Sequence, residues 1–192
     1  MKYNQSNLKK AKKYLDNNNC IGIPTETVYG LAGNAYSDRA VKKIFNLKKR
    51  PKNNPLIVHY YNLSNLKKDC VLNKNFFLLY KKFCPGPLTF ILKLKNKTKI
   101  SKFVTNNKNT LAVRFPKHQI IRTLIKNLNY PLAAPSANIY SKLSPVKADD
   151  VKEEFGNKIK FVLDGGECKV GIESTILNLT SKPEILRLGG TE

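Results

Sequence analysis

Acidic residues are scarce in this chain, and the scarcity limits the chemistry that it can carry out. The 192 residues include 35 Lys and Arg but only 13 Asp and Glu, together with two His and no Trp, for a formal net charge of +22. No Ser/His/Asp set and no paired carboxylates of the glycosidase type can be assembled from so few groups. Covalent and general acid catalysis are therefore disfavoured. The abundant cations suit anion binding and the charge stabilisation of phosphoryl transfer.

Other motifs and segments are also missing. The four cysteines form no Cys-x-x-Cys pair, so we expect free thiols, mostly buried, and no protein-bound metal. No apolar run approaches the ~18 residues of a membrane span. The N-terminus lacks the apolar centre of a signal peptide, and together these absences predict a cytoplasmic protein with no membrane partner. Neither a Gly-x-x-x-x-Gly-Lys-Ser/Thr loop nor a Gly-x-Gly-x-x-Gly motif occurs.

The excess positive charge has two explanations. A strongly basic balance is typical of a protein with a polyanion partner such as RNA. The chain is also rich in Asn and Ile, and Lys far outnumbers Arg, which is the composition that an AT-rich coding sequence produces regardless of function. Both explanations stay open at this point.

The periodicity of apolar residues predicts one domain over residues 1–192 with a mixed sheet. One helix is expected to begin at Ser6 and another at Asp38, and three more are expected over residues 73–83, 118–128 and 144–156. The last of these has Ser144 as its N-cap, Pro145 in its first turn and Gly156 at its end. Strands are expected at 20–24, 55–61, 88–95, 110–115, 130–135, 159–166, 174–179 and 184–190. Because several strands follow one another directly, we expect an α/β fold whose mixed sheet has helices packed on it.

Polar residues recur where the expected strands end. The stretch GIPTETVYGLAG, residues 22–33, places Thr25, Glu26, Thr27 and Tyr29 among apolar positions, where an unpaired polar group costs a few kcal/mol. Other polar residues close to the ends of expected strands and helices are Lys48, Arg50, Asn54, His59, Thr110, Arg114, Ser136, Asn138, Ser144, Glu173, Ser174, Thr175 and Arg187. Ligands bind at strand ends in open sheets, so these segments are predicted to converge on one site.

Arg114 lies inside the apolar stretch TLAVRF, where a lone cation needs a partner. The partner is either a structural carboxylate or an anionic ligand, and the scarcity of acids favours the ligand. Glu26 is expected to pair with a basic residue behind the pocket.

Eight motifs in order resemble one family. They are PTETVYGLAG, KKRPKNNPLIVH, CPGPLTFIL, LAVRFP, PLAAPSAN, the Ser144-Pro145 pair, VLDGG and GIESTIL. This order resembles that of the YrdC-like family, the threonylcarbamoyl-AMP synthases, in their single-domain form. The resemblance runs from about Ile21 to Gly189.

The resemblance implies a twisted open sheet around a positively charged cavity. It implies condensation of L-threonine, bicarbonate and ATP to threonylcarbamoyl-AMP and pyrophosphate, for threonylcarbamoyladenosine formation in tRNA by a downstream transferase complex. Mg²⁺ would be held mainly through the ATP phosphates. By position, the implied L-threonine contacts are Thr27, His59, Arg114, Ala134 and Ser174. The implied ATP contacts are Arg50, Asn54, Thr110, Ser136, Ser144 and Arg187, with Lys48 and Arg50 beside the phosphates as catalytic residues.

The chain departs from the family pattern at three places. Lys49 replaces the Gly of Lys-Gly-Arg-Pro, Tyr140-Ser141 replaces Ser-Gly after PSAN, and Leu188 replaces the Pro of Arg-Pro-Gly. The alternative to the synthase is a non-catalytic RNA-binding module that uses the same basic cavity. Such a module has no need of a Thr/Glu/Tyr pocket beside an apolar strand.

Overall fold

The computed structural model describes residues 4–191, so residues 1–3 and 192 of the predicted domain lie outside the described range. The helices are α1 (Gln5–Asp16), α2 (Asp38–Lys48), α3 (Leu63–Asp69), α4 (Lys74–Phe83), α5 (Lys102–Thr105), α6 (Gln119–Lys126) and α7 (Ala148–Phe155), followed by the 3-10 turn η1 (Gly156–Lys158). The strands are β1 (Ile21–Ile23), β2 (Gly30–Asn34), β3 (Ile57–His59), β4 (Leu88–Lys93), β5 (Thr110–Arg114), β6 (Leu132–Ala133), β7 (Thr175–Asn178) and β8 (Glu184–Arg187).

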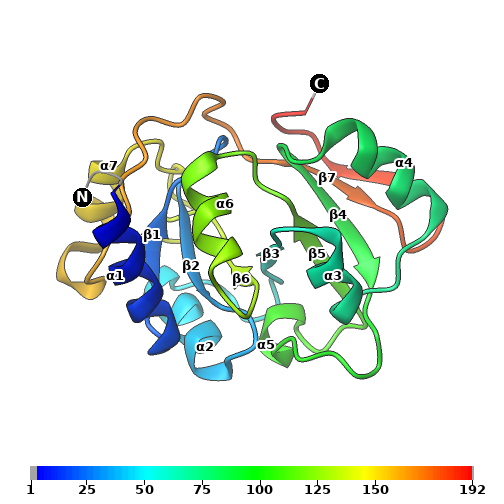
Figure 1. The fold of residues 1–192 in the computed structure, drawn as a ribbon, viewed down its shortest axis with the longest axis horizontal. Helices are drawn as coiled ribbons and strands as arrows, with labels where there is room; N and C mark the ends of the chain where they lie inside the picture. Colours follow the sequence, from blue (N-terminus) through cyan, green and yellow to red (C-terminus); the bar gives the residue numbers. More distant parts are fainter. Residues whose placement is uncertain (1–3, 192) are drawn as a thin grey trace.

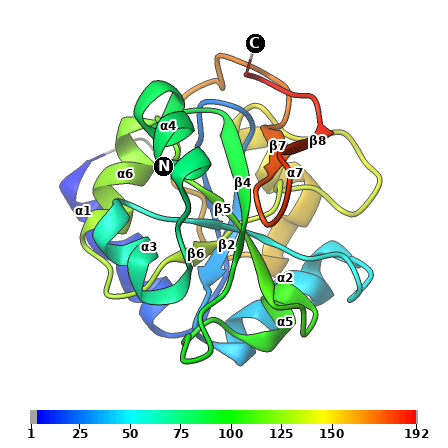
Figure 2. The same cartoon turned by 90° about the vertical axis from the view of Figure 1, so that its right-hand side faces the viewer.

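The strands form one mixed sheet in the order β1-β2-β6-β3-β5-β4-β7-β8. The pairs β3–β5 and β4–β7 are parallel, and the other neighbours are antiparallel. Figure 1 shows α6, α3 and α4 in front of the sheet, and Figure 2 shows α2 and α7 on its other side. The predicted α/β class with a mixed twisted sheet is confirmed.

The register of the central strands separates a core face from an open face. Val58, Val113 and Phe90 are register partners across β3, β5 and β4, and all three are fully buried in the larger hydrophobic core. Successive side chains of a strand point to opposite faces of the sheet. The neighbouring positions, His59 and Arg114 among them, therefore face away from this core.

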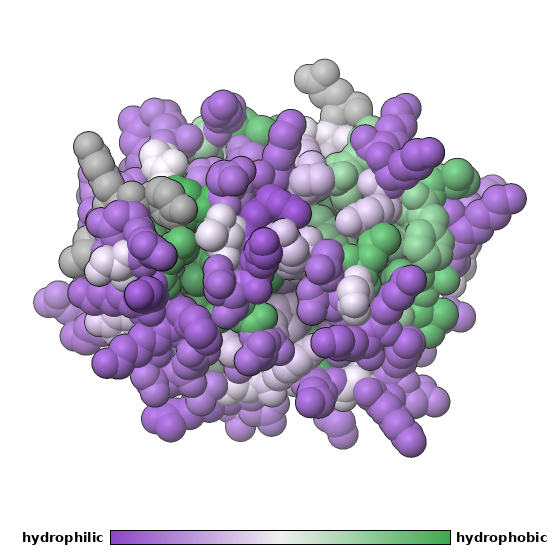
Figure 3. Space-filling view, in the orientation of Figure 1, coloured by the Kyte–Doolittle hydropathy of each residue, from purple (hydrophilic) through white to green (hydrophobic). Residues whose placement is uncertain are grey.

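A second hydrophobic cluster joins α1 and α6 to the first strands. Leu15 of α1 and Leu124 of α6 pack there with Ile21 and Ile23 of β1. Most of the surface in Figure 3 is hydrophilic, and apolar surface gathers over α4, where Phe77 and Leu78 are exposed.

Most of the expected elements form, and two differ for identifiable reasons. Helix α7 begins at Ala148 rather than in the first turn after Ser144. The N–H groups of Val146 and Lys147 both donate to Asp150 Oδ2, so an acceptor inside the helix caps its start. Ser144, in the loop before α7, instead donates to Glu173 in the segment that precedes β7.

The expected strand at 159–166 is not a strand of the sheet. It makes isolated bridges, one of them between Gly22 and Val162. Gly22 donates to Phe161 O and accepts from the N–H group of Leu163. The elements β2, α3 and α5 were not predicted as separate elements from the sequence.

The cysteines behave as predicted. All four are free, and Cys84 alone is partly exposed. Burial raises the pKa of the Cys20 and Cys70 thiols to about 12, so neither is a thiolate at neutral pH. Within residues 4–191, no helix is long and apolar enough to cross a membrane.

Candidate functional site

A cavity of about 530 Å³ lies on the open face of the sheet. Its floor follows the register of the strands. Ile57, Ala112 and Ile91 form one row across β3, β5 and β4, and His59 pairs with Arg114 in the next row. The cavity floor is thus apolar in one row and polar in the adjacent row.

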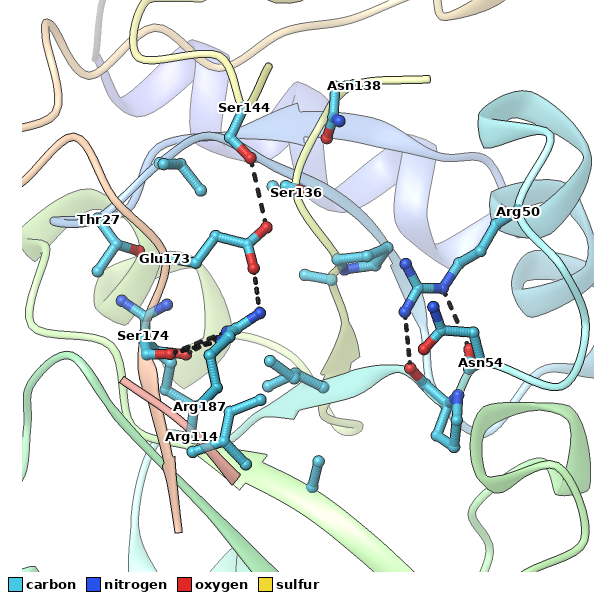
Figure 4. Close-up of a pocket in the computed structure, with 18 of the residues that line it drawn as sticks. Thr27, Arg50, Asn54, Arg114, Ser136, Asn138, Ser144, Glu173, Ser174 and Arg187 are labelled. Atoms are coloured by element: carbon cyan, nitrogen blue, oxygen red, sulfur yellow. Dashed lines mark hydrogen bonds and ion pairs between the residues drawn. The ribbon is translucent and has the colours of Figure 1, made fainter. Parts of the chain in front are cut away.

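Segments far apart in the sequence converge on this cavity, as the polar strand ends predicted (Figure 4). Of the predicted site residues, those that line it are Thr27, Lys48, Arg50, Asn54, His59, Arg114, Ala134, Ser136, Ser144, Ser174 and Arg187. Thr25, Tyr29, Asn138 and Glu173 line it as well. Thr110 is not among the lining residues. It lies on the same face of β5 as Ala112 and Arg114, one row beyond the cavity floor.

Arg114 and His59 are the most deeply placed polar groups of the floor. Arg114 is 4% exposed and His59 is 2% exposed. Burial, followed by the charge of Arg114, holds the pKa of His59 well below its usual value, so the imidazole is neutral. Within the described residues, His59 Nδ1 and Arg114 Nε have no hydrogen-bond partner. Such buried groups are normally satisfied, so this pair points to a bound ligand.

Glu26 holds Arg114, one of the two residues of this row, by a direct contact. Its Oε1 accepts a 2.8 Å hydrogen bond from Arg114 Nη2, and its Oε2 accepts from the backbone N–H of Lys117 at 2.9 Å. Burial raises the pKa of Glu26, but the charge and hydrogen bond of Arg114 outweigh it and leave the pKa below its usual value. The prediction that Glu26 pairs with a basic residue is confirmed, and Arg114 has a structural carboxylate as well as a place in the cavity.

The turn between β1 and β2 places Thr27 in the cavity. Thr25 Oγ1 accepts from the N–H groups of Thr27 and Val28 and donates to Val28 O at 2.6 Å. The two threonine hydroxyls lie 2.8 Å apart. Tyr29 OH donates to Gly166 O and accepts from Gly165 N, so it ties the turn to the neighbouring loop. These contacts satisfy most of the hydroxyls and leave Thr27 facing the cavity.

Lys48 lies under the loop 136–144, which forms one wall. Its Nζ donates to Ser136 O at 2.6 Å and to Asn138 O at 2.5 Å. Burial, with a smaller contribution from Arg50, lowers the pKa of Lys48 to about 8. The ammonium therefore fixes the wall in this state of the protein. A place beside bound phosphates stays a prediction.

Arg50 and Arg187 occupy opposite sides of the cavity (Figure 4). Arg50 donates from Nε to Asn54 O and from Nη2 to Pro55 O, each at 3.1 Å. Arg187 forms an ion pair with Glu173 and donates to Ser174 O from Nε and Nη2. Among residues 4–191, Arg50 has no carboxylate partner and is held in a fixed orientation, whereas the charge of Arg187 is offset.

Four polar or charged lining residues were not recognised as site residues in the sequence. They are Lys108, Tyr140, Ser141 and Lys142. Tyr140 and Lys142 belong to the loop SANIYSKLSPV, whose departure from the family pattern was the available signal. Lys108 precedes Thr110 by two residues and carries no motif of its own.

The departures at Lys49 and Tyr140-Ser141 have a common backbone feature. Lys49 ends α2 with φ of +50°, and Ser141 has φ of +70°. This left-handed region favours glycine. The chain thus keeps a conformation that glycine adopts more easily, with different residues in place.

The fold and the site together define a class: an α/β protein whose open sheet face forms a small-molecule cavity with anion-binding side chains. The family model that covers the Sua5, YciO and YrdC proteins matches residues 13–189 of this chain; the description of that family reads "Telomere recombination". The chain belongs to this family.

The relatives that it matches include synthases from an archaeon and a bacterium. The chain is 43% identical over 185 residues to the threonylcarbamoyl-AMP synthase of Pyrococcus abyssi, covering 94% of this chain and 53% of the relative. It is 41% identical to that of Bacillus subtilis, covering 97% and 54%. The chain therefore spans about half the length of these two relatives. A putative synthase of Methanocaldococcus jannaschii, at 36% identity, is covered to 80% of its length.

Solved structures give the same fold. Pyrococcus abyssi Sua5 complexed with L-threonine superposes with a TM-score of 0.94 at 39% identity, covering 98% of this chain and 56% of that one. E. coli YciO superposes at 0.88 with 21% identity, covering 98% and 92%, and supports the fold alone.

Proposed function

We propose that this chain is a threonylcarbamoyl-AMP synthase, a nucleotidyltransferase that makes threonylcarbamoyl-AMP and pyrophosphate from L-threonine, bicarbonate and ATP. The observation that carries the proposal is the pair of buried, unpartnered nitrogens, His59 Nδ1 and Arg114 Nε, in adjacent strands of the cavity floor. The names of the two relatives above 40% identity support it. So does the binding of L-threonine by Pyrococcus abyssi Sua5.

The floor suits an amino acid. Arg114 is a cation that one carboxylate, Glu26, offsets within residues 4–191, and it would take the threonine carboxylate. Neutral His59 offers an acceptor to the ammonium or hydroxyl group. Thr27 and Ser174 would contact the ligand through their hydroxyls, and Ala134 through its backbone.

The proposed reaction needs no protein nucleophile. The amine of threonine attacks bicarbonate, which gives a carbamate with loss of water. A carbamate oxygen then attacks the α-phosphorus of ATP, the bond from that phosphorus to the bridging oxygen breaks, and pyrophosphate leaves. Arg50 has no carboxylate partner in the described part of the chain and would offset the developing charge. Asn54, Thr110, Ser136, Ser144 and Arg187 are proposed to bind the nucleotide.

Lys48 is proposed to act in two ways. Its ammonium holds the wall loop at Ser136 and Asn138, and its positive charge adds to the field at the phosphates. The excess of cations over carboxylates along the lining supports a positively charged cavity.

The proposed Mg²⁺, held through ATP, is consistent with the side chains that line the cavity. Among the described residues there is no group of three His, Cys, Asp or Glu that could hold a metal. Within that range Glu173 is the sole carboxylate of the lining, and it is engaged by Arg187 and Ser144. The ion would therefore be held by the phosphate oxygens, and when bound it offsets phosphate charge.

The decisive test is release of pyrophosphate from ATP that depends on both threonine and bicarbonate, with mass-spectrometric detection of threonylcarbamoyl-AMP. Arg114→Ala should weaken threonine binding by about 2–5 kcal/mol, because it removes a buried charge partner. Folded protein that releases no pyrophosphate would overturn the proposal. Unchanged threonine affinity in the variant would remove Arg114 from the site.

The RNA-binding alternative predicts affinity that falls steeply with salt and has no dependence on threonine. The unpartnered nitrogens of the floor favour a small ligand, because a nucleic-acid backbone needs exposed cations rather than buried ones. Delivery of the product to a tRNA-modifying transferase complex, and action in the cytoplasm, belong to the same proposal. Direct binding of tRNA would be compatible with it.

A further inference from the structure

The cationic side chains of the cavity differ in how fully they are engaged. Arg114 pairs with Glu26, and Arg187 pairs with Glu173. The Lys48 ammonium donates hydrogen bonds to two carbonyl oxygens of the wall loop. Arg50 pairs with no carboxylate of the described residues, but two backbone carbonyls fix its orientation. None of these groups is a mobile, uncompensated charge.

Lys108 and Lys142 are different. Both line the cavity and both are exposed. Within residues 4–191 the Lys108 side chain forms no hydrogen bond and no ion pair. Lys108 follows the left-handed residues Asn106 and Asn107 and precedes β5. It approaches the cavity from the end of β5 opposite Arg114.

Lys142 has a fixed backbone and a loosely held side chain. Its carbonyl accepts a 2.6 Å hydrogen bond from Asn138 Nδ2 within the wall loop. Its Nζ lies 3.2 Å from Glu154 Oε2 of α7, and the Lys142 side chain is 60% exposed in this pair. Exposed ion pairs contribute little to stability, so the ammonium can exchange this carboxylate for a more highly charged partner at small cost.

We propose that Lys108 and Lys142 bind the β- and γ-phosphates of the nucleotide and offset the charge of the departing pyrophosphate. The inference rests on the proposed function and adds two residues to its site. Most of the charge of ATP lies on the terminal phosphates, and a flexible lysine supplies a mobile point charge that can follow them as they leave. The fixed arginines are suited to holding groups that stay in place.

Calorimetric titration with ATP and with AMP tests the proposal on the wild type and the double variant Lys108→Ala/Lys142→Ala. Lys9→Ala/Lys13→Ala on α1 is the matched control, since both lysines are exposed on the far side of the sheet and the change in charge is the same. We expect about tenfold or greater loss of ATP affinity in the cavity variant. AMP affinity should change by less than about twofold, because AMP lacks the two phosphates concerned. The control should bind both nucleotides as the wild type does.

Three results would overturn the inference. Equal losses for ATP and AMP would mean that the lysines support the wall rather than the terminal phosphates. An equal loss in the control would mean that net charge alone is responsible, and unchanged ATP affinity would exclude both residues. Pyrophosphate release by the wild type separates the two proposals: if it occurs, these results overturn only the role of the lysines. A wild type that binds neither nucleotide and releases no pyrophosphate overturns both.

Discussion

Substitution of Glu26 by Gln should destabilise the protein strongly, although Glu26 is not among the residues that line the cavity. The Glu26 side chain is 11% exposed and that of Arg114 is 5% exposed, with 2.8 Å between Oε1 and Nη2. Removal of one partner from a buried pair costs about 3–5 kcal/mol, because the other charge is left uncompensated. Gln keeps an oxygen that can accept from Arg114, so we expect about 3 kcal/mol, the lower end of that range. For a chain of this size that loss lowers Tm by roughly 6–12 °C.

The pH dependence of the stability difference shows whether the ionised Glu26 carboxylate is the cause of the destabilisation. Glu26 has a folded-state pKa below its ordinary value of 4.5. Its contribution to stability is therefore complete above the unfolded-state pKa and is lost as the pH falls through the folded-state pKa. Urea denaturation should show a wild-type advantage over Glu26→Gln that is constant above about pH 5 and shrinks below about pH 4. Asp149→Asn, which removes a fully exposed carboxylate, should leave Tm unchanged.

A double-mutant cycle with Arg114→Met completes the test. If the two side chains stabilise each other, the double variant should be more stable than the sum of the single losses predicts, by at least about 1 kcal/mol. Additive losses, or a Glu26→Gln loss below about 1 kcal/mol, would refute the reasoning that the pair is a buried ionic contact. Threonine affinity of Glu26→Gln, measured in parallel, shows whether orientation of Arg114 matters for binding.

Three further predictions concern single positions. Lys49→Gly should raise stability by about 1 kcal/mol, since φ is +50° there, whereas Lys49→Ala should give no gain; thermal denaturation of both variants decides this. Gly189→Ala should cost about 1–3 kcal/mol, because the added Cβ would lie 2.2 Å from Glu173 O, and an unchanged Tm would contradict it. Pyrophosphate release should fall as the pH rises through about 8, where Lys48 loses its proton and therefore its positive charge, which also weakens its hydrogen bonds to the wall carbonyls; Lys48→Met should show low activity without this alkaline limb.

The sequence predicts the central strands of the sheet better than the positions at which loops end and helices begin. Apolar runs such as LTFILK and TLAVR are long enough to specify β4 and β5 without tertiary information. The start of α7 depends instead on Asp150, whose carboxylate accepts from two N–H groups that precede the helix. A Ser-Pro pair is a good local start signal, and the contact of Ser144 with Glu173 overrides it.

The candidate site was predictable to the extent that its residues carry motifs. Convergence of the strand ends followed from residue types and spacing, and Glu26 was expected to have a basic partner. The sequence could not show that Arg114 is that partner, because the two residues are 88 positions apart and meet only when the turn between β1 and β2 lies against the end of β5. Lys108 and Lys142 could not be told apart from the other lysines of a chain with a net charge of +22.

The few acidic residues explain how such a basic chain holds a specific cavity. Of 13 Asp and Glu, Glu26, Glu154 and Glu173 each contact a residue of the lining: Arg114, Lys142 and Arg187. Glu26 and Glu173 each fix an arginine that would otherwise be repelled by its neighbours, since like charges in a partly enclosed site disfavour one another, whereas the exposed Lys142 is only loosely held by Glu154. The surface lysines supply a general attraction for anions, and that attraction is weakened by salt. Selection among anions then depends on the geometry set by Glu26 and Glu173, so removal of either carboxylate should reduce specificity more than removal of a surface lysine.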